Sequence, residues 1–450
     1  MSWNTLVDKL SSHAGSVVGW LDRHKIDMLC IQEAKVNRQE LLTNSKYIIP
    51  GFDFYAAPNL LPGRGGNGVA TLLRRATTPP VEGVDFAPLG NAALDQEGRC
   101  LVTLHLGGLA VVNVYVPNDR SVKRFPAKMD FLRDLTGLLL KLKAAKRQIL
   151  LLGDFNIIAR PADVYWKRRL IDIGALNGKM PTDLASFASA MTQEVSEKLR
   201  LALEEVRPVP CEKRNWWTLD YCDEAWPEEV FWSSEECSIA VSLEERREGE
   251  FIFKRKDRVP VFVMFEVLEK KLSVKFSQAV QRRVADFLGE SMGSPASVDW
   301  LEKTILDFGL VDSHLKFHES AKDRFTVWEM SRKDRKENRG FRLDYILADE
   351  NLKLRLGGPL PLVSHENEAA ALCATSDDTQ FEFACSSPFR TGITYTPELY
   401  SDHVPVTAVI DLQPSETVST EWTLKCAATL KVAEASLQAV SGRRRKTLAN

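Results

Sequence analysis

Acidic, amide and imidazole side chains recur in this sequence where short apolar segments begin or end. Glu33 ends one such segment, Asp154 and Asn156 end a second, and Asp402 and His403 begin a third. A single polar residue at such a place is usually a turn former. Because the ends of neighbouring strands meet at one edge of a sheet, where ligands bind, the repetition predicts a common site.

The carboxylates among these residues predict a site for a divalent metal ion. Glu33 and Asp402 offer the hard oxygen ligands that Mg²⁺ prefers. Asp154 could orient or deprotonate an attacking water molecule. The sequence has no Ser or Cys in a nucleophile motif and no glycine-rich loop of the Walker type. This combination favours a water molecule as the nucleophile.

The remaining polar residues fit a phosphate group as the target. Tyr115, Asn156 and His403 could donate hydrogen bonds to a phosphate whose negative charge grows in the transition state. Asp344, in a further apolar segment, would fix the tautomer of His403. The sequence therefore predicts metal-assisted attack of water on a phosphodiester.

Alternating strands and helices over residues 1–164, and again over residues 297–412, predict one α/β domain in two parts. Residues 125–147 have the 3.6-residue period of an amphipathic helix. They lead into residues 148–156, whose continuous apolar run is typical of a central strand buried on both faces. This order places the strand ends with the polar residues inside one domain.

Two predicted insertions and a tail interrupt or extend this domain. Residues 165–296 are acidic and hold five of the ten tryptophans, which predicts a partly ordered insertion and not simple disorder. A looser loop insertion spans residues 357–397, and residues 413–450 form a C-terminal tail.

The composition is that of a soluble globular chain. Of its 450 residues, 44% are hydrophobic and 27% are charged, and no window is apolar enough for a membrane span. The eight cysteines form no C-x-x-C pair, which argues against a zinc finger and favours a reducing compartment. The net charge of -2 conceals an acidic run at residues 220–250, so the rest of the chain is net basic. A polyanionic partner is therefore compatible with this chain.

Nine short motifs occur in a fixed order along the chain. They are Trp3–Asn4, Cys30–Lys35, Gly68–Ala70, Asp95–Arg99, Asn113–Asn118, Gly153–Asn156, Phe325–Trp328, Gly340–Tyr345 and Ser401–Pro405. Together they resemble the exonuclease III-like apurinic/apyrimidinic (AP) endonuclease branch of the endonuclease/exonuclease/phosphatase superfamily. Residues 93–99, 160–163 and 311–313 resemble the second eukaryotic type within that branch, AP endonuclease 2. The resemblance covers about residues 1–165 and 297–412.

The resemblance implies a four-layer α/β sandwich, in which two packed β-sheets are flanked by helices, and a Mg²⁺-dependent phosphodiesterase that Mn²⁺ also supports. Members of the branch cut DNA beside abasic sites, remove 3′-blocking groups and degrade 3′ ends in base excision repair. The implied metal-binding residues are Asn4, Glu33, Asp154, Asn156, Asp402 and His403. The implied catalytic residues are Tyr115, Asp154, Asn156, Asp344 and His403. The implied substrate-binding residues are Arg99, Asn118, Phe325, Trp328, Phe341 and Arg342.

Three of these substrate-binding residues have a specific expected role. Phe325, Trp328 and Phe341 resemble the apolar wall of the family's abasic-sugar pocket, although plain core packing is the alternative. The basic run at residues 332–342 and the basic residues 167–169 are candidates for contact with the DNA backbone, or are solvated loops.

The chain departs from the family pattern near its start. Leu6 stands where members usually carry Asp or Asn at the metal site, and Gly66 stands where an aromatic residue is expected. The motif at Trp3 normally follows an apolar strand. We therefore expect either a first strand of three residues or a natural chain that begins earlier, and we favour the second because neighbouring strands would otherwise be unpaired.

Partners and location follow from weaker signals. Residues 281–288 fit the spacing of a sliding-clamp-binding motif, and they equally fit one face of an ordinary helix. The basic run at residues 443–446 is typical of a nuclear address or of a solvated terminus. With double-stranded DNA as the expected substrate, we expect a nuclear monomer that does not contact a membrane.

Two other functions compete with the DNA repair nuclease. The first is another phosphodiesterase of the superfamily, such as a retrotransposon-type endonuclease, an RNA-directed nuclease or a phosphatase. The motifs at residues 95–99 and 340–345 argue against it. The second is a catalytically weakened scaffold that kept the fold, for which Leu6 and the unusual N-terminus are the evidence.

Overall fold

The computed structural model describes two groups of residues. The main group comprises residues 2–36, 39–61, 66–118, 124–172, 295–328, 332–357 and 389–412. The second comprises strands at residues 216–219, 229–233, 238–247, 250–255, 261–264 and 289–290. The clamp-like motif at residues 281–288, the basic run at residues 443–446 and most of the loop insertion lie outside the described residues.

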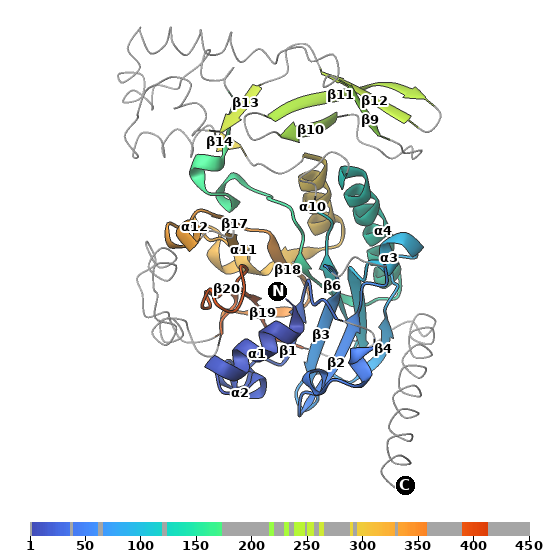
Figure 1. The fold of residues 1–450 in the computed structure, drawn as a ribbon. Coiled ribbons are helices and arrows are strands. Elements are labelled where there is room, and N and C mark those ends of the chain that lie inside the picture. The colour runs from blue at the N-terminus through green and yellow to red at the C-terminus, as the bar shows by residue number, and fades with distance from the viewer. Residues whose placement is uncertain are drawn as a thin grey trace.

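A six-stranded sheet forms the centre of the fold (Figure 1). Its strands are, in spatial order, β15 (Leu310–Asp312), β18 (Asp344–Asp349), β7 (Gln148–Asp154), β6 (Leu109–Tyr115), β5 (Cys100–His105) and β4 (Val81–Asp85). Strands β6 and β7 are parallel, and every other neighbouring pair is antiparallel. Strand β7 therefore lies between two partners and ends beside both of them.

The predicted long helix is α4 (Phe125–Ala144), which connects β6 to β7 and covers one face of the sheet. Leu132, Leu135 and Leu139 recur at helical spacing and are fully buried against the sheet. Helix α10 (Pro295–Asp307) packs beside α4 on the same face. The continuous apolar run of β7 is buried, as the sequence predicts for a central strand.

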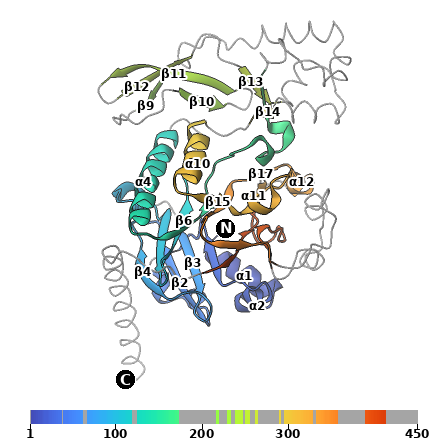
Figure 2. The same ribbon diagram turned by 180° about the vertical axis from the view of Figure 1, so that it is seen from behind.

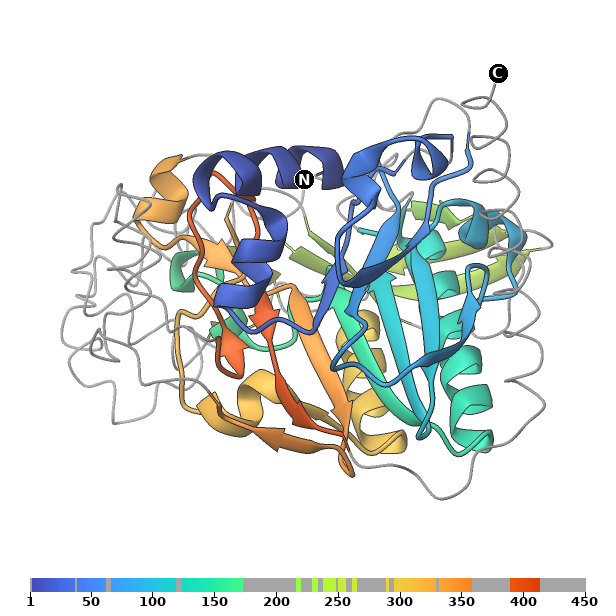
Figure 3. The same ribbon diagram turned by 90° about the horizontal axis from the view of Figure 1, so that it is seen from below.

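A second sheet packs against the other face of the first. It has three strands, in the order β1 (Met28–Ile31), β3 (Val69–Arg74) and β2 (Phe52–Ala57). Helices α1 (Trp3–His13) and α2 (Val17–Arg23) cover it from outside. Figure 3 shows the dark blue helices α1 and α2 on the side of the strands opposite to the teal α4 and the gold α10. The order helix, sheet, sheet, helix is the predicted four-layer sandwich.

A buried amide joins the two sheets. Asn113 on β6 donates from Nδ2 to the carbonyl oxygen of Ala70 on β3, at 2.9 Å, and Gln32 donates from Nε2 to Oδ1 of Asn113, at 2.8 Å. Asn113 is fully buried, and a buried polar group is stable only when it is hydrogen-bonded. These bonds fix the sheets relative to each other close to Glu33 and Tyr115, which follow Gln32 and Asn113 in sequence.

The three-residue first strand, the less favoured of the two alternatives, does not form. Residues from Trp3 onward are helical, and the Ser2 side chain accepts a hydrogen bond from the backbone N–H of Thr5 at 3.3 Å, as an N-cap does. The backbone N–H of Trp3 donates to the carbonyl oxygen of Ala34 at 2.9 Å, which attaches the start of α1 to the end of the β1 segment. Sequence pattern alone did not predict this helix.

Part of the predicted insertion forms a separate seven-stranded sheet, seen beyond α4 and α10 (Figure 2). Its strands are β8 (Leu170–Asp172), β9 (Trp216–Leu219), β10 (Glu229–Ser233), β11 (Ser238–Arg247), β12 (Glu250–Arg255), β13 (Val261–Met264) and β14 (Gly289–Glu290). All its described pairings are antiparallel.

The remaining elements are short. The helical ones are α3 (Ala92–Gln96), α11 (Ser313–His318), α12 (Arg332–Lys336) and single turns at Glu40–Leu42, Ser45–Tyr47, Pro161–Asp163 and Trp166–Arg168. Three two-stranded pairs join β16 (Val327–Trp328) to β17 (Gly340–Phe341), β19 (Lys353–Arg355) to β22 (Val409–Asp411), and β20 (Gly392–Ile393) to β21 (Val406–Thr407). Among the helices of the described part of the chain, none has the length and apolar character that a membrane crossing requires.

Candidate active site

The strand register brings three of the predicted site residues side by side. Tyr115 at the end of β6 is the pairing partner of Asp154 at the end of β7, and Asp154 is the pairing partner of Asp344 at the start of β18. Directly paired residues on neighbouring strands place their side chains on the same face of the sheet. Two carboxyl groups and a phenol therefore meet at one edge of the six-stranded sheet.

His403 completes this group from the loop before β21. Its Nδ1 lies 2.9 Å from Oδ2 of Asp344, and ligand atoms of Asp154, Asp344 and His403 lie within 4.8 Å of one another. Burial by itself would lower the pKa of His403. The charge and the hydrogen bond of Asp344 outweigh burial and raise that pKa to about 10. At neutral pH the imidazole is consequently a cation that can donate from its other nitrogen.

Asp154 is buried and has the pKa of a base that works near neutral pH. Burial, and next the charge of Asp344, raise the pKa of Asp154 to about 7, while the charge of His403 opposes this rise. A carboxyl group with a pKa near the working pH transfers protons most effectively. Its environment therefore suits Asp154 to accept a proton from water.

The loop after β7 fixes Asn156 in an uncommon backbone conformation. Its φ is 50°, in the left-handed region, and its backbone N–H donates to Oδ1 of Asp154 at 2.9 Å. Its side-chain Nδ2 donates to the carbonyl oxygen of Val116 at 3.0 Å. On the other side, the buried Lys128 of α4 donates from Nζ to the carbonyl oxygen of Asn156 at 2.7 Å. The amide is thus held rigidly beside Asp154.

Glu33 and Tyr115 form a short hydrogen bond between the two sheets. The hydroxyl of Tyr115 donates to Oε1 of Glu33 at 2.5 Å, and Nζ of Lys35 lies 3.3 Å from Oε2. Burial favours a higher pKa for Glu33, but the bond from Tyr115 and the charge of Lys35 outweigh it and lower the pKa. Burial and the same bond raise the pKa of Tyr115 well above its usual range. Glu33 is therefore an anion beside a neutral donor.

The residues around Glu33 fit a hard divalent cation. Asn4 lies in the first turn of α1, which is bonded to the segment directly after Glu33. Its Nδ2 donates to Glu40 at 3.3 Å, while its Oδ1 is buried and has no hydrogen-bond partner among the described residues. A buried, unsatisfied amide oxygen near a carboxylate is the kind of ligand that Mg²⁺ accepts.

Asp402 and Leu6 differ in their surroundings from this group. Asp402 is exposed beside His403 and accepts a hydrogen bond from the Ser401 hydroxyl at 3.2 Å. Partial loss of water around the carboxyl group opposes the change, but the charge of His403 lowers the pKa of Asp402. Leu6 is partly buried against the apolar cluster beneath α1. The position that usually carries a polar group therefore contributes to packing in this chain.

Comparison with known proteins places the chain in a family. Residues 1–245, more than half of the chain, match the model of the Endonuclease/Exonuclease/phosphatase family. The chain belongs to this family. Membership confirms the resemblance drawn from the nine motifs, and with the observed layers it confirms the predicted four-layer fold. The match also extends into the predicted insertion, whose boundaries stay a prediction.

Relatives with known names match this chain over about a third of its length. The DNA-(apurinic or apyrimidinic site) endonuclease 2 of Bos taurus is 33% identical over 177 residues, which are 32% of this chain and 34% of the relative. The protein of the same name from Mus musculus is 35% identical over 174 residues, covering 32% and 33%. The matched segments thus span about a third of the length of these curated relatives. Among solved structures, the catalytic domain of Xenopus laevis APE2 is 19% identical, with a TM-score of 0.43, and covers 91% of this chain and 88% of that chain.

The structure places two further residues of this family member close to Tyr115. Arg99 donates from Nη1 to the carbonyl oxygen of Tyr115 at 3.2 Å, and its guanidinium lies 4.8 Å from the centre of the Tyr115 ring. It also donates to Glu97 at 2.5 Å. Asn118 is half-buried just after β6. Both predicted substrate-binding residues therefore lie on the β6 side of the site.

The predicted apolar wall is only partly accessible. Phe325 and Trp328 are 0% and 2% exposed and form a small core with Tyr395 and Val404. Phe341 is half-buried, and the guanidinium of Arg168 lies 5.2 Å from the centre of its ring. Of the three aromatic residues, Phe341 is thus the one with surface available for a substrate.

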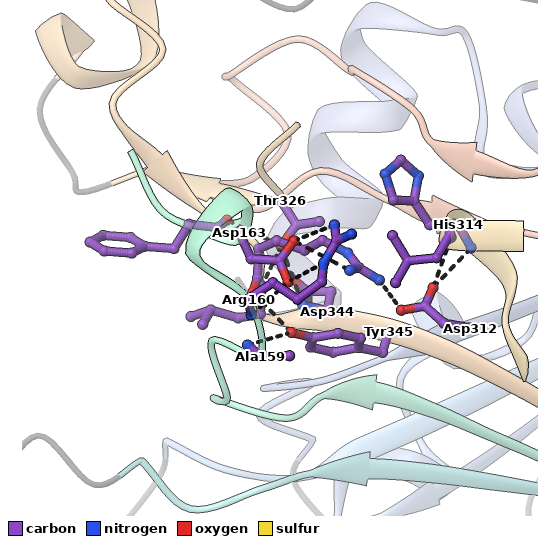
Figure 4. A network of polar contacts seen from close by, with 12 residues as sticks. Ala159, Arg160, Asp163, Asp312, His314, Thr326, Asp344 and Tyr345 are labelled. Atoms are coloured by element: carbon purple, nitrogen blue, oxygen red, sulfur yellow. Dashed lines mark hydrogen bonds and ion pairs between the residues drawn. The ribbon is translucent and has the colours of Figure 1, made fainter. Parts of the chain in front are cut away.

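Arg342 lies in a buried ion network and not at the surface where a substrate contact was expected. It is 1% exposed, ion-paired with Asp312, and 3.4 Å from Oδ1 of Asp163. Figure 4 shows these two carboxylates in one polar network with Arg160, Tyr345 and Asp344. A buried ion pair persists only with such partners, so Arg342 joins segments of the fold.

The basic run at residues 332–342 contains another buried arginine. Arg335 is 4% exposed and its guanidinium lies 4.9 Å from the centre of the Trp328 ring. It donates to the carbonyl oxygens of Thr396 and Ser401, and so supports the loop that carries His403. The sequence analysis included Arg335 only in a run expected to contact DNA or solvent and did not single out Lys128, because buried and solvated cations have the same sequence signal.

Proposed function

We propose that this chain is a metal-dependent DNA repair nuclease that hydrolyses phosphodiesters at abasic sites and processes 3′ ends. The observation that carries the proposal is the convergence of Asp154 with the Asp344–His403 pair and the Tyr115–Glu33 pair. The relatives from Bos taurus and Mus musculus, whose names denote endonucleases acting at apurinic or apyrimidinic sites of DNA, support DNA as the substrate.

In the proposed reaction, Asp154 accepts a proton from the attacking water as the water oxygen bonds to phosphorus. The bond from phosphorus to the leaving sugar oxygen breaks, and that oxygen takes a proton from solvent. The cationic His403 and the Asn156 amide donate hydrogen bonds to the phosphate as its negative charge grows, and the Tyr115 hydroxyl joins them when it turns from Glu33 to the phosphate. Asp344 holds the imidazole in position through the bond at 2.9 Å. Glu33, Asn4 and Asp402 would hold Mg²⁺, which when bound would offset negative charge on the phosphate oxygens.

The geometry bears on the competing functions. A scaffold without catalysis would not need a buried carboxyl group, Asp154, next to an imidazole that is paired with Asp344. The intact cluster therefore favours an enzyme. A phosphodiesterase with a different substrate would share the same chemistry, and the assay below separates it. Nuclear location, a monomeric state and the clamp contact at residues 281–288 are further parts of the proposal.

The test uses two end-labelled DNA duplexes, one with an internal abasic analogue and one with a recessed, 3′-blocked end. Each is incubated with the full chain and Mg²⁺, with EDTA added, or with the Asp154→Asn variant. We expect metal-dependent cleavage that the substitution abolishes, and the faster substrate identifies the preferred activity. Lack of cleavage of both duplexes by folded protein would contradict the proposed function.

Removing the Glu33 carboxylate is expected to weaken metal binding. In the wild type, Mg²⁺ should raise the melting temperature, because a ligand that binds the folded state stabilises it. In Glu33→Gln this shift should largely disappear, because a neutral amide is a poorer Mg²⁺ ligand. Thermal denaturation against Mg²⁺ concentration measures it. Asp53→Asn, which removes a surface carboxylate paired with Arg75, should retain the shift.

Replacing Lys128 is expected to slow the reaction through Asn156. Lys128→Met removes the donor to the Asn156 carbonyl, and we expect kcat to fall about tenfold with a small change in KM. Lys128→Arg should restore much of the rate. Lys143 lies in the same helix, α4, and forms an ion pair with the buried Asp349 of β18. Lys143→Met removes this ion pair and is the control, which should lower stability while leaving kcat unchanged. Equal kcat for Lys128→Met and wild type would contradict this role.

A further inference from the structure

Asp344 and His403 lie 59 residues apart in sequence, and their hydrogen bond requires two separate backbone segments to stay in register. Strand β18 fixes Asp344 against Asp154. The loop of His403 lacks such a strand at that point, and Val327 forms one isolated antiparallel bridge with His403. The segment just before β16 therefore lies beside both members of the pair.

Thr326 occupies this segment and contacts both backbones. Its Oγ1 accepts hydrogen bonds from the backbone N–H groups of Leu343, at 3.0 Å, and Asp344, at 3.3 Å. Its carbonyl oxygen accepts the backbone N–H of Val404 at 2.8 Å. One residue thus bonds to Asp344 directly and to the neighbour of His403. Figure 4 shows Thr326 and Asp344 close together.

The hydrogen-bonding capacity of this hydroxyl is fully used. Besides the two bonds that it accepts, Oγ1 lies 3.5 Å from the carbonyl oxygen of Phe341, in the direction for a weak donated bond. The backbone N–H of Thr326 donates to the same carbonyl at 2.8 Å. A hydroxyl offers one donor and two acceptor positions, which only Ser or Thr supplies at this size. Thr326 is 0% exposed, so water cannot replace these bonds.

We propose that Thr326 is a positioning residue that holds the Asp344–His403 pair in its catalytic register. The hydroxyl fixes the start of β18, and the carbonyl of the same residue fixes the chain after His403. The two oxygens belong to one residue and are joined only through Cβ, Cα and the carbonyl carbon, so this short covalent path sets the spacing between the two segments. This inference rests on the proposed function for its kinetic consequence, while the geometry of the pair can be measured without turnover.

The experiment compares two substitutions that separate shape from hydrogen bonding. Thr326→Val keeps the shape but leaves the N–H groups of Leu343 and Asp344 without an acceptor, whereas Thr326→Ser keeps the hydroxyl. We expect kcat on the cleaved duplex to fall about 10- to 100-fold in Thr326→Val, with KM within about twofold, because small misplacements of catalytic groups cost rate. Thr326→Ser should stay within about threefold of the wild type.

A second readout reports the pair itself. The proton shared by His403 Nδ1 and Asp344 should give a far-downfield resonance in the proton NMR spectrum of wild type and Thr326→Ser, and this resonance should shift or broaden in Thr326→Val. Thr103→Val, which removes a buried hydroxyl that contacts His105 elsewhere in the sheet, is the matched control and should leave kcat and the resonance unchanged.

The outcomes are distinguishable. Unchanged kcat and an unchanged resonance in folded Thr326→Val, or equal losses in the Ser and Val variants, would overturn the positioning role. If the wild type cleaves neither duplex, the proposed function fails, while the resonance still tests the positioning of the pair. If Thr326→Val does not fold, Thr326→Cys takes its place, because a thiol is a weak acceptor. It should lose rate and resonance where Ser retains both.

Discussion

Asp154→Asn is expected to reduce kcat about 1000-fold or more while the protein stays folded. The amide has nearly the same shape as the carboxyl group, but it cannot accept a proton from water, and removal of a general base typically costs about 10²- to 10⁴-fold in rate. Asp154 is buried between Tyr115 and Asp344, so no bulk water can substitute for it. Steady-state cleavage of the labelled duplexes measures the effect, and thermal denaturation checks the fold.

The pH dependence of the wild type provides an independent check on the same group. Burial and the charge of Asp344 raise the pKa of Asp154 to about 7, so the carboxyl group is protonated and inactive at lower pH. We therefore expect kcat/KM to rise from pH 5 to about pH 8 and then level off. The residual rate of Asp154→Asn should lack this rise. A wild-type profile that is flat from pH 5 to 8 would contradict the assigned base.

Gly153→Ala is expected to destabilise the protein by about 3 to 5 kcal/mol and to remove activity with it. Gly153 precedes Asp154 and has a φ of 138°, which residues with a side chain rarely adopt. A Cβ there would lie 1.9 Å from the carbonyl oxygen of Val114 on β6. The alanine would therefore push β6 and β7 apart at the point where Tyr115 meets Asp154.

A glycine in helix α4 provides the matched control. Gly137 has no atom within 4 Å of an added Cβ, so Gly137→Ala should stabilise the protein by about 0.5 to 1 kcal/mol. Urea denaturation of both variants measures the difference. If Gly153→Ala unfolds at the same urea concentration as the wild type, β6 and β7 do not approach each other as closely at Gly153 as the structure shows.

Much of the fold could be predicted from local pattern. Strand β7 and helix α4 form because their apolar side chains must be buried. The spacing of apolar residues in the sequence shows which element buries them: a continuous run for β7 and a period of about 3.6 residues for α4. The start of the chain could not be predicted in the same way. No repeating apolar pattern precedes Trp3 and Asn4 from which a helix could be predicted. Their helix depends on the Ser2 cap and on the hydrogen bond from the Trp3 N–H to the Ala34 carbonyl.

The residues of the candidate site likewise fall into those that the sequence could predict and those that it could not. Residue types at strand ends indicated which side chains carry chemistry, and the register then placed Tyr115, Asp154 and Asp344 abreast. The burial of Arg342 and Arg335 could not be predicted, because a basic run has the same composition whether its cations face water or buried carboxylates and carbonyls.

The sequence by itself determined the chemistry of this protein, because carboxylate, amide, phenol and imidazole groups differ in what they can bind and which protons they can transfer. Tertiary structure alone decided the working properties of those groups. The charge of Asp344 acts on Asp154 and His403 only when strands distant in sequence bring them within a few ångströms, and burial strengthens that interaction. The supporting contacts of Thr326 and Lys128 likewise exist only once the chain has folded, since hydrogen bonds depend on distance and not on order in the sequence.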